Sequence, residues 1–138
     1  MPQRILAVDD EPHMLLLLER IISSKTTYPI ATTSNSLEVP DLLDSEKFDV
    51  IISDLKMPGL DGIDILRLIK EKGLKTEMII ITAFGSLETT MDAMSLGVSG
   101  YILKPFKKEQ IILAIERTME LQRVKHDKVL LDKLLTNE

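Results

Sequence analysis

The chain has 138 residues, of which 44% are hydrophobic and 28% charged, a composition that predicts one globular domain with a single core. The absence of cysteine excludes disulfide bonds and thiolate metal sites. A net charge of -5 argues against a nucleic-acid-binding surface, and no apolar run approaches the roughly 20 residues that cross a bilayer. We therefore expect a cytoplasmic domain that contacts neither nucleic acid nor membrane directly.

Strand-like apolar runs alternate with amphipathic segments along the chain. Residues 5–8 form a short continuous apolar run, which is typical of a strand buried on both faces. Pro12 then stands where the first turn of a helix tolerates proline, and residues 14–22 carry a helical apolar pattern. The chain therefore opens with a strand followed by a helix.

The next strand and helix are less clearly marked. Residues 29–33 form a weaker strand candidate, and Ser36 could cap a helix in which Pro40 lies no later than the first turn. The apolar residues of that helix are Leu37, Leu42 and Leu43.

The central part of the chain carries clearer signals. Residues 48–53 predict a third strand, after which Asp61 is a plausible N-cap, Asp64 is an acid in the first turn, and Gly73 ends the helix. Residues 78–82 predict a fourth strand.

The following helix begins at the cap residue Ser86 and ends before Gly97. Its apolar residues are Leu87, Met91, Met94 and Leu96. We expect Met91 and Met94 to lie in the core, with an adaptable partner surface as the alternative. Residues 100–103 predict a fifth strand.

From about Lys108 onward no glycine or proline occurs, which predicts one long amphipathic helix. Leucines continue beyond the length that five β-α units require, so something should cover them. The spacing of Val124, Leu131 and Leu134 supports a coiled coil only moderately, because Asp127 interrupts the seam. We expect a domain at residues 1–122 and a helical extension or linker at 123–138.

Five β-α units in about 120 residues imply an α/β fold, and right-handed crossovers leave few topologies. We expect a doubly wound, five-stranded parallel sheet of the flavodoxin-like order 2-1-3-4-5. In that order the carboxyl ends of the first and third strands frame the crevice where ligands bind. Asp9, Asp10 and Asp54 would line this crevice, and Lys104 follows the fifth strand.

Three clustered carboxylates raise one another's pKa, so the cluster is costly unless a cation or protons relieve it. Mg²⁺ prefers oxygen ligands and commonly takes one or two carboxylates together with a phosphate. An alternative interpretation is that Asp9 or Asp10 only caps the next helix. That reading does not account for all three acids together.

Four segments carry this chemistry: Asp9-Asp10-Glu11-Pro12, Ser53-Asp54-Leu55-Lys56-Met57-Pro58-Gly59-Leu60-Asp61-Gly62, Thr82-Ala83 and Gly100-Tyr101-Ile102-Leu103-Lys104-Pro105-Phe106. In order and spacing they resemble the response-regulator receiver domains of two-component signalling, over residues 3–122. The resemblance implies that Asp54 accepts a phosphoryl group from a phosphohistidine of a sensor histidine kinase.

The same resemblance implies the other site roles. Asp10 and Asp54 would bind Mg²⁺ directly, Asp9 mainly through water, and the backbone carbonyl of Lys56 would complete the ligand set. Thr82 and Lys104 would hold the phosphoryl oxygens.

Two further pairs of residues receive roles from the resemblance. Thr82 and Tyr101 would form a coupled switch that carries the phosphorylation signal to a distant surface. The side chains of Lys56 and Phe84 would border the attacking water and tune the lifetime of the phosphoryl group. The Lys104-Pro105 bond would be cis.

The C-terminal extension resembles the linker that joins receivers to ATPase-type transcription activators, where such chains often dimerise. This resemblance implies a phosphorylation-activated domain that controls an output domain. A stand-alone relay protein is the runner-up. The last helix would allow a homodimer.

A magnesium-dependent phosphatase with Asp54 as nucleophile is the alternative from another class. Haloacid-dehalogenase-like phosphatases place a second aspartate two residues after the nucleophile, where this chain has Lys56. A degenerate receiver that only binds partners is a third possibility, against which the complete set of acids, threonine and lysine argues.

Overall fold

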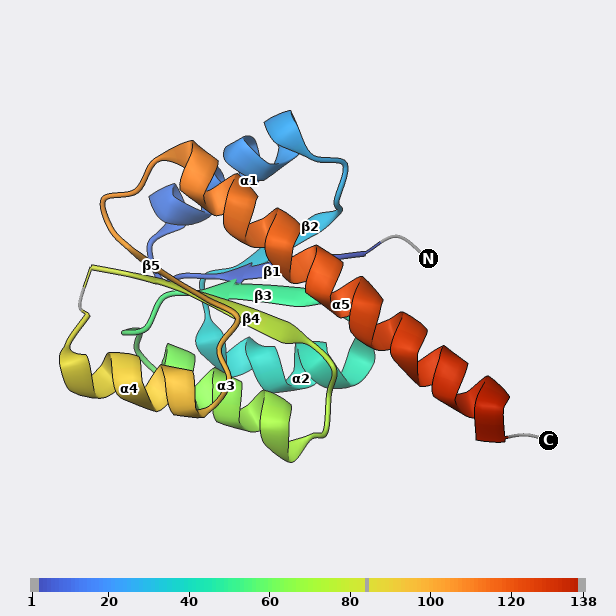
Figure 1. Ribbon diagram of the computed structural model, residues 1–138. Helices are drawn as coiled ribbons and strands as arrows, with labels where there is room; N and C mark the ends of the chain where they lie inside the picture. The colour runs from blue at the N-terminus through green and yellow to red at the C-terminus, as the bar shows by residue number, and fades with distance from the viewer. Residues whose placement is uncertain (1–2, 84, 137–138) are drawn as a thin grey trace.

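The computed structural model, which describes residues 3–83 and 85–136, is a parallel five-stranded sheet between two layers of helices (Figure 1). The strand order is β2-β1-β3-β4-β5, as predicted. The strands are β1 (Ile5–Val8), β2 (Ile30–Thr33), β3 (Val50–Ser53), β4 (Glu77–Thr82) and β5 (Gly100–Leu103). The helices are α1 (Pro12–Lys25), the short 3-10 helix η1 (Ser36–Glu38), α2 (Val39–Ser45), α3 (Gly62–Glu71), α4 (Leu87–Ser95) and α5 (Lys108–Thr136).

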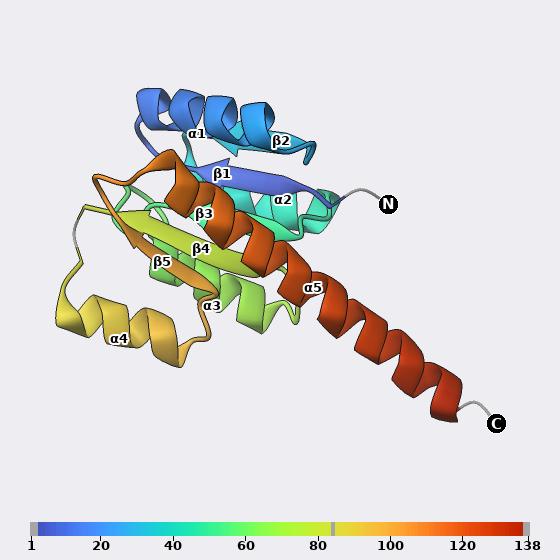
Figure 2. The same cartoon turned by 45° about the horizontal axis from the view of Figure 1, so that its top comes forward.

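The two helix layers bury opposite faces of the sheet. Helices α1 and α5 cover one face, and α2, α3 and α4 cover the other (Figures 1 and 2). Successive strand residues serve these faces alternately: Ile5 and Ala7 pack with α1 and α5, whereas Leu6 and Val8 pack with α2 and α3. This is why β1 is a continuous apolar run, and all four of its residues are buried.

The strand register aligns the residues that end each strand. Val8 pairs with Ser53 across β1 and β3, and Thr82 pairs with Leu103 across β4 and β5. The residues that follow these strands therefore emerge together at one edge of the sheet.

The predicted ends of α3 and α4 are confirmed. Asp61 and Asp64 form a reciprocal capping box at the start of α3, and Gly73, with φ of +64°, follows its C-terminus. At the start of α4 the Ser86 hydroxyl accepts a hydrogen bond from the Thr89 N–H. Pro12 occupies the first turn of α1, also as predicted.

The prediction that Ser36 caps the second helix is wrong. Asn35 caps η1, its side chain accepting a hydrogen bond from the Leu37 N–H, whereas α2 begins at Val39 after Glu38 without a side-chain capping hydrogen bond. Leu37 is 63% exposed. Ser36 is instead buried and faces the loop that follows β3.

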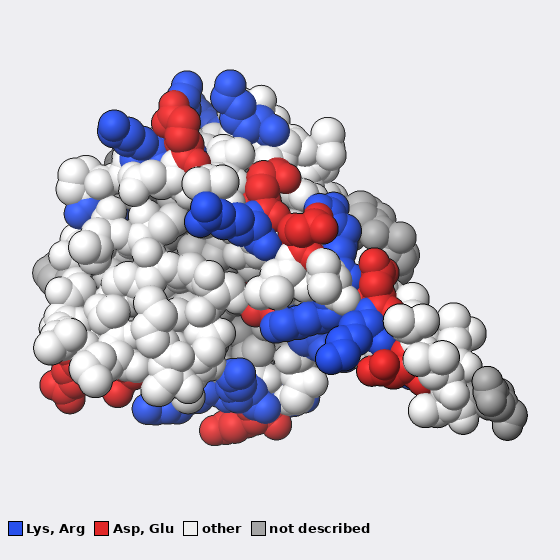
Figure 3. Space-filling view, in the orientation of Figure 1, with Lys and Arg blue, Asp and Glu red and all other residues white. Residues whose placement is uncertain are grey.

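The expectation that Met91 and Met94 lie in the core is also wrong. They are 60% and 55% exposed, because α4 reaches the core mainly through Ala93, which is fully buried. Leu87 on α4 and Leu103 on β5 are also exposed. In the view of Figure 3 the surface over β5 and the upper side of α4 is mostly uncharged, whereas charged groups lie along the lower edge. Glu88 and Asp92 of α4 are exposed.

Helix α5 projects beyond the sheet (Figures 1 and 2). Its first half buries Ile111, Ile115 and Met119 against the sheet. The helix remains attached to the amino end of β4 as far as Lys125, which pairs with the buried Glu77 at 2.5 Å. The exposed apolar residues of its second half are Val124, Leu130, Leu131, Leu134 and Leu135. No helix in the described part of the chain has the length and apolar character to cross a membrane.

Candidate functional site

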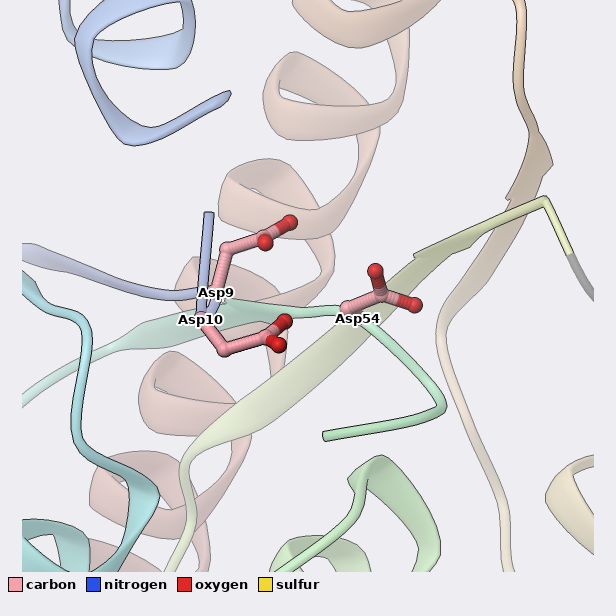
Figure 4. A group of neighbouring side chains, drawn as sticks. All are labelled: Asp9, Asp10 and Asp54. Carbon is pink, nitrogen blue, oxygen red and sulfur yellow. The ribbon is translucent and has the colours of Figure 1, made fainter. Parts of the chain in front are cut away.

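Three carboxylates meet where β1 and β3 end. Asp9 and Asp10 follow β1, Asp54 follows β3, and one oxygen of each lies within 4.8 Å of the others. The carboxylates of Asp9 and Asp10 extend toward Asp54 (Figure 4). Asp9 and Asp54 are 2% and 6% exposed, whereas Asp10 is exposed. The cluster thus has two buried members and one that solvent reaches.

The ammonium group of Lys104 faces the buried carboxylates. Lys104 follows β5, and its backbone N–H donates to the Thr82 carbonyl, which ties the turn to the end of β4. Its Nζ lies 3.0 Å from Asp54 Oδ2 and 3.4 Å from Asp9 Oδ2. The Lys104-Pro105 bond is cis, as expected. The sheet edge therefore brings together residues that are 95 positions apart.

Backbone N–H groups hold the opposite oxygen of each buried carboxylate. Asp9 Oδ1 accepts a hydrogen bond from the Glu11 N–H at 2.9 Å, and Asp54 Oδ1 accepts one from the Lys56 N–H at 3.3 Å. Each carboxylate is consequently oriented between a backbone N–H and the ammonium of Lys104.

Burial and charge shift the pKa of two members of this cluster in the same direction. Burial raises the pKa of Asp9, and the nearby Asp54 charge adds to the effect, against the Glu11 N–H and the Lys104 ammonium, which lower it. Burial alone would lower the pKa of Lys104, but its hydrogen bond to Asp54 and the charges of Asp9 and Asp54 outweigh burial and raise it. Lys104 therefore remains a cation at neutral pH.

The backbone at Asp54 is packed against the start of α3. The Gly62 N–H donates to the Leu55 carbonyl at 2.9 Å, and a Cβ on Gly62 would lie only 2.7 Å from the Asp54 carbonyl oxygen. Only glycine fits this close approach. The sequence contained this residue within the receiver-like segment, but no pattern in it indicated the contact.

The expected switch residues lie on the neighbouring strands β4 and β5. Thr82 ends β4 and is fully buried. Tyr101 in β5 is half-buried, and its hydroxyl oxygen is buried without a hydrogen-bond partner among residues 3–83 and 85–136. A Cβ on Gly85 would lie 3.4 Å from that oxygen, so the ring borders the loop between β4 and α4. Phe84 lies outside the described residues, and the Lys56 side chain is exposed.

The donor atoms of the acidic cluster determine which cation would suit it. The cluster offers carboxylate oxygens and no sulfur or imidazole, which suits a hard divalent ion such as Mg²⁺. The three acids carry more negative charge than the ammonium of Lys104 can balance, so a divalent cation would complement the cluster. The residues therefore fit Mg²⁺.

Comparisons with known proteins agree with this arrangement. The model of the response regulator receiver domain family matches residues 5–116. The chain is 32% identical over 122 residues to sporulation initiation phosphotransferase F of Bacillus subtilis, with 88% of this chain and 98% of that protein covered. It is 33% identical over 112 residues to the DNA-binding transcriptional regulator NtrC of Escherichia coli, with 81% of this chain covered. This chain spans only 24% of the length of NtrC.

Solved structures show the same fold. A response regulator receiver domain protein from Clostridium thermocellum has a TM-score of 0.80 at 31% identity, over 88% of this chain and 98% of that chain. The signal receiver domain of a putative LuxO repressor protein from Vibrio parahaemolyticus has a TM-score of 0.84 at 22% identity, over the whole of both chains. On the family match, the relatives and the acidic cluster at the sheet edge, this chain belongs to the receiver domain family of two-component response regulators.

Proposed function

We propose that Asp54 accepts a phosphoryl group from the phosphohistidine of a sensor histidine kinase. The observation that carries this proposal is the position of the Asp54 carboxylate, which is buried in the acidic cluster with Lys104 Nζ at 3.0 Å. An anionic carboxylate beside a fixed cation suits attack on phosphorus, where negative charge must be neutralised.

In the transfer, a carboxylate oxygen of Asp54 attacks phosphorus and the bond from phosphorus to the histidine nitrogen breaks. The electron pair of that bond returns to the imidazole ring, which takes up a proton. The product is an acyl phosphate on Asp54, which water later hydrolyses to restore the carboxylate. In both steps, phosphoryl transfer and hydrolysis, the protein contributes positioning and charge neutralisation.

The acidic cluster would hold Mg²⁺ through Asp10 and Asp54 directly, Asp9 through water, and the backbone carbonyl of Lys56. When bound, Mg²⁺ supplies positive charge against the phosphoryl oxygens. Lys104 supplies a second positive group, and Thr82 supplies a hydroxyl to the same oxygens. The excess of carboxylates over ammonium groups in the cluster supports this assignment.

Thr82 and Tyr101 would form the switch that reads the phosphoryl group. If the Thr82 hydroxyl and Lys104 each gain a charge-assisted hydrogen bond, the two contribute roughly 3–6 kcal/mol, against about 5.5 kcal/mol for inverting a 1:99 equilibrium. The buried Tyr101 hydroxyl has no hydrogen-bond partner in the described part of the chain, which supports a ring that can change position without breaking a hydrogen bond. The exposed surface of α4 and β5, with its apolar residues Leu87, Met91, Met94 and Leu103, is then the surface whose shape changes (Figure 3).

We propose residues 1–122 as the receiver domain and residues 123–138 as a linker to an output domain, with transcription as the output. Relatives described as transcriptional regulators, NtrC among them, support this output. The similarity to sporulation initiation phosphotransferase F supports the runner-up, a stand-alone relay. The exposed leucines of α5 support a homodimer through this helix, and the setting of such a pathway is the cytoplasm.

The lifetime of the acyl phosphate would depend on the side chains of Lys56 and Phe84, which we propose border the attacking water. The exposed Lys56 side chain at the rim of the site supports a role in water access. Exchange of Lys56 for alanine should therefore change the rate of dephosphorylation.

Intact-mass measurement tests the proposal. The chain is incubated with acetyl phosphate, with Mg²⁺ or with EDTA, and compared with Asp54→Ala and with Asp44→Ala, which removes an exposed carboxylate outside the cluster. We expect one added phosphoryl group that requires Mg²⁺ and Asp54 but not Asp44. Labelling of Asp54→Ala at the normal level would overturn the proposal, and continuous turnover of phosphomonoesters would favour the phosphatase instead. Sedimentation of the same samples measures assembly.

A further inference from the structure

The hydroxyl of Ser36 joins two loops that the strand order brings together. Ser36 lies in η1 after β2, is 2% exposed, and donates its hydroxyl hydrogen to the Pro58 carbonyl at 2.8 Å. The same oxygen accepts a hydrogen bond from the Leu60 N–H at 2.8 Å. One buried side chain thus satisfies two backbone groups of the loop between β3 and α3 (54–61), which we call the β3–α3 loop.

The β3–α3 loop has a turn that fits closely around this hydroxyl. Gly59 has φ of +82°, and a Cβ at this position would lie 2.9 Å from Ser36 Oγ and 3.0 Å from a carbon of Leu37. Glycine is therefore required both by the backbone conformation and by the approach of Ser36. The contact between the two loops is specific in shape as well as in hydrogen bonding.

The segment that carries Ser36 is itself fixed. Asn35 caps it through the Leu37 N–H at 3.1 Å, and the Thr33 hydroxyl donates to Glu38 Oε2 at 2.9 Å. The Thr33 carbonyl accepts a hydrogen bond from the Asp9 N–H at 3.3 Å. The end of β2 and the turn that follows it therefore contact both chain segments that supply carboxylates to the cluster.

We propose that Ser36 is a positioning residue for the metal site. It fixes the β3–α3 loop against the turn after β2, and so sets the Lys56 carbonyl relative to the carboxylates of Asp10 and Asp54. This inference rests on the proposed function, because it assigns Ser36 to the Mg²⁺ site described there. Partners that orient metal ligands without touching the metal commonly change metal affinity by about 10- to 100-fold when removed.

Ser36→Ala tests the inference. It removes both hydrogen bonds and leaves the three carboxylates in place. The control is Ser24→Ala, which removes an exposed hydroxyl that bonds only to the Ile21 carbonyl of its own helix. Mg²⁺ is titrated into the unphosphorylated protein while backbone amide NMR shifts are recorded, and the rate of phosphorylation by acetyl phosphate is measured at saturating Mg²⁺.

We expect Ser36→Ala to weaken Mg²⁺ binding by about 10-fold, whereas Ser24→Ala binds as the unchanged protein does. At saturating Mg²⁺ the phosphorylation rate of Ser36→Ala should return close to the normal rate, since the chemical groups remain. If Ser36 only stabilised the fold, Ser36→Ala would lower the free energy of unfolding. It would not weaken Mg²⁺ binding while leaving the phosphorylation rate at saturating Mg²⁺ normal. Normal Mg²⁺ affinity in a folded Ser36→Ala protein would overturn the inference.

Amide hydrogen exchange of the unchanged protein supplies a test that does not depend on folding of the variant. The Leu60 N–H should be protected before Mg²⁺ is added, because Ser36 accepts its hydrogen bond. Exchange of this amide at the rate of an open loop would also overturn the inference. If the unchanged protein binds no Mg²⁺, the proposed function fails. If the unchanged protein and Ser36→Ala bind Mg²⁺ equally well, only the role of Ser36 fails.

Discussion

The ion pairs of Lys104 lead to a quantitative prediction for Lys104→Met. The side chain of Lys104 is 14% exposed, and those of its partners Asp54 and Asp9 are 7% and 3% exposed. Methionine keeps the length of the side chain but removes the charge, which deprives two buried carboxylates of the ammonium that pairs with both. The substitution should therefore destabilise the metal-free protein.

The magnitude follows from burial. Removing one member of a buried ion pair costs about 3–5 kcal/mol, because the remaining charge is left uncompensated. We expect about 3 kcal/mol, the lower end of that range, because the exposed Asp10 shows that solvent reaches the cluster. The pair between Lys72 and Asp44 is the matched control, since Asp44 is 64% exposed and such pairs contribute about 0–1 kcal/mol.

Urea unfolding of the unchanged protein, Lys104→Met and Lys72→Met, each in EDTA and in saturating Mg²⁺, measures the effect. Lys104→Met should lose about 3 kcal/mol of unfolding free energy in EDTA and much less in Mg²⁺, where a bound cation compensates the same carboxylates. Addition of Asp54→Asn to Lys104→Met should restore most of the loss in EDTA. Equal losses for the two lysine variants, or no recovery in the double variant, would refute the reasoning.

Three further substitutions test separate parts of the site. Thr82→Ala should leave phosphorylation of Asp54 largely intact but weaken its effect on dimerisation or partner binding, so undiminished coupling in sedimentation would contradict the switch role. Gly62→Ala should lower the unfolding free energy by at least about 1–3 kcal/mol, since its Cβ would lie 2.7 Å from the Asp54 carbonyl oxygen; urea unfolding at the normal midpoint would show that the approach is not constrained. Tyr101→Phe removes a buried hydroxyl that has no partner in the described structure, so its thermal midpoint should stay the same or rise, and a clear decrease would indicate a hidden partner for that hydroxyl.

The order of apolar runs and the residues that end them were sufficient to predict the sheet and most of the site. A run such as residues 5–8 is buried on both faces only in a parallel sheet covered by helices, so few topologies remained. Once the strand order is set, Asp9, Asp54 and Lys104 must emerge at one edge, because strand ends are aligned by register. The capping roles of Asp61 and Ser86 could be predicted because they depend only on residues nearby in the chain.

The wrong predictions concern residues whose surroundings depend on the packing of the whole fold. Met91 and Met94 have the spacing of a buried stripe, but spacing shows only that residues share a face of a helix, and the rest of the fold decides whether anything covers that face. Ser36 has the properties of a cap, yet its hydroxyl is used by a loop that lies 22 to 24 residues further along the chain.

The sequence by itself determined which side chains could do the chemistry, because the residues that end parallel strands are set by local pattern. The tertiary structure alone decided how those side chains are held. The hydrogen bonds of Ser36 and the pair between Lys125 and Glu77 join segments that are distant in the chain. The close approach of Gly62 to the Asp54 carbonyl closes the loop between β3 and α3. Such contacts depend on how whole elements pack, so no local pattern encodes them.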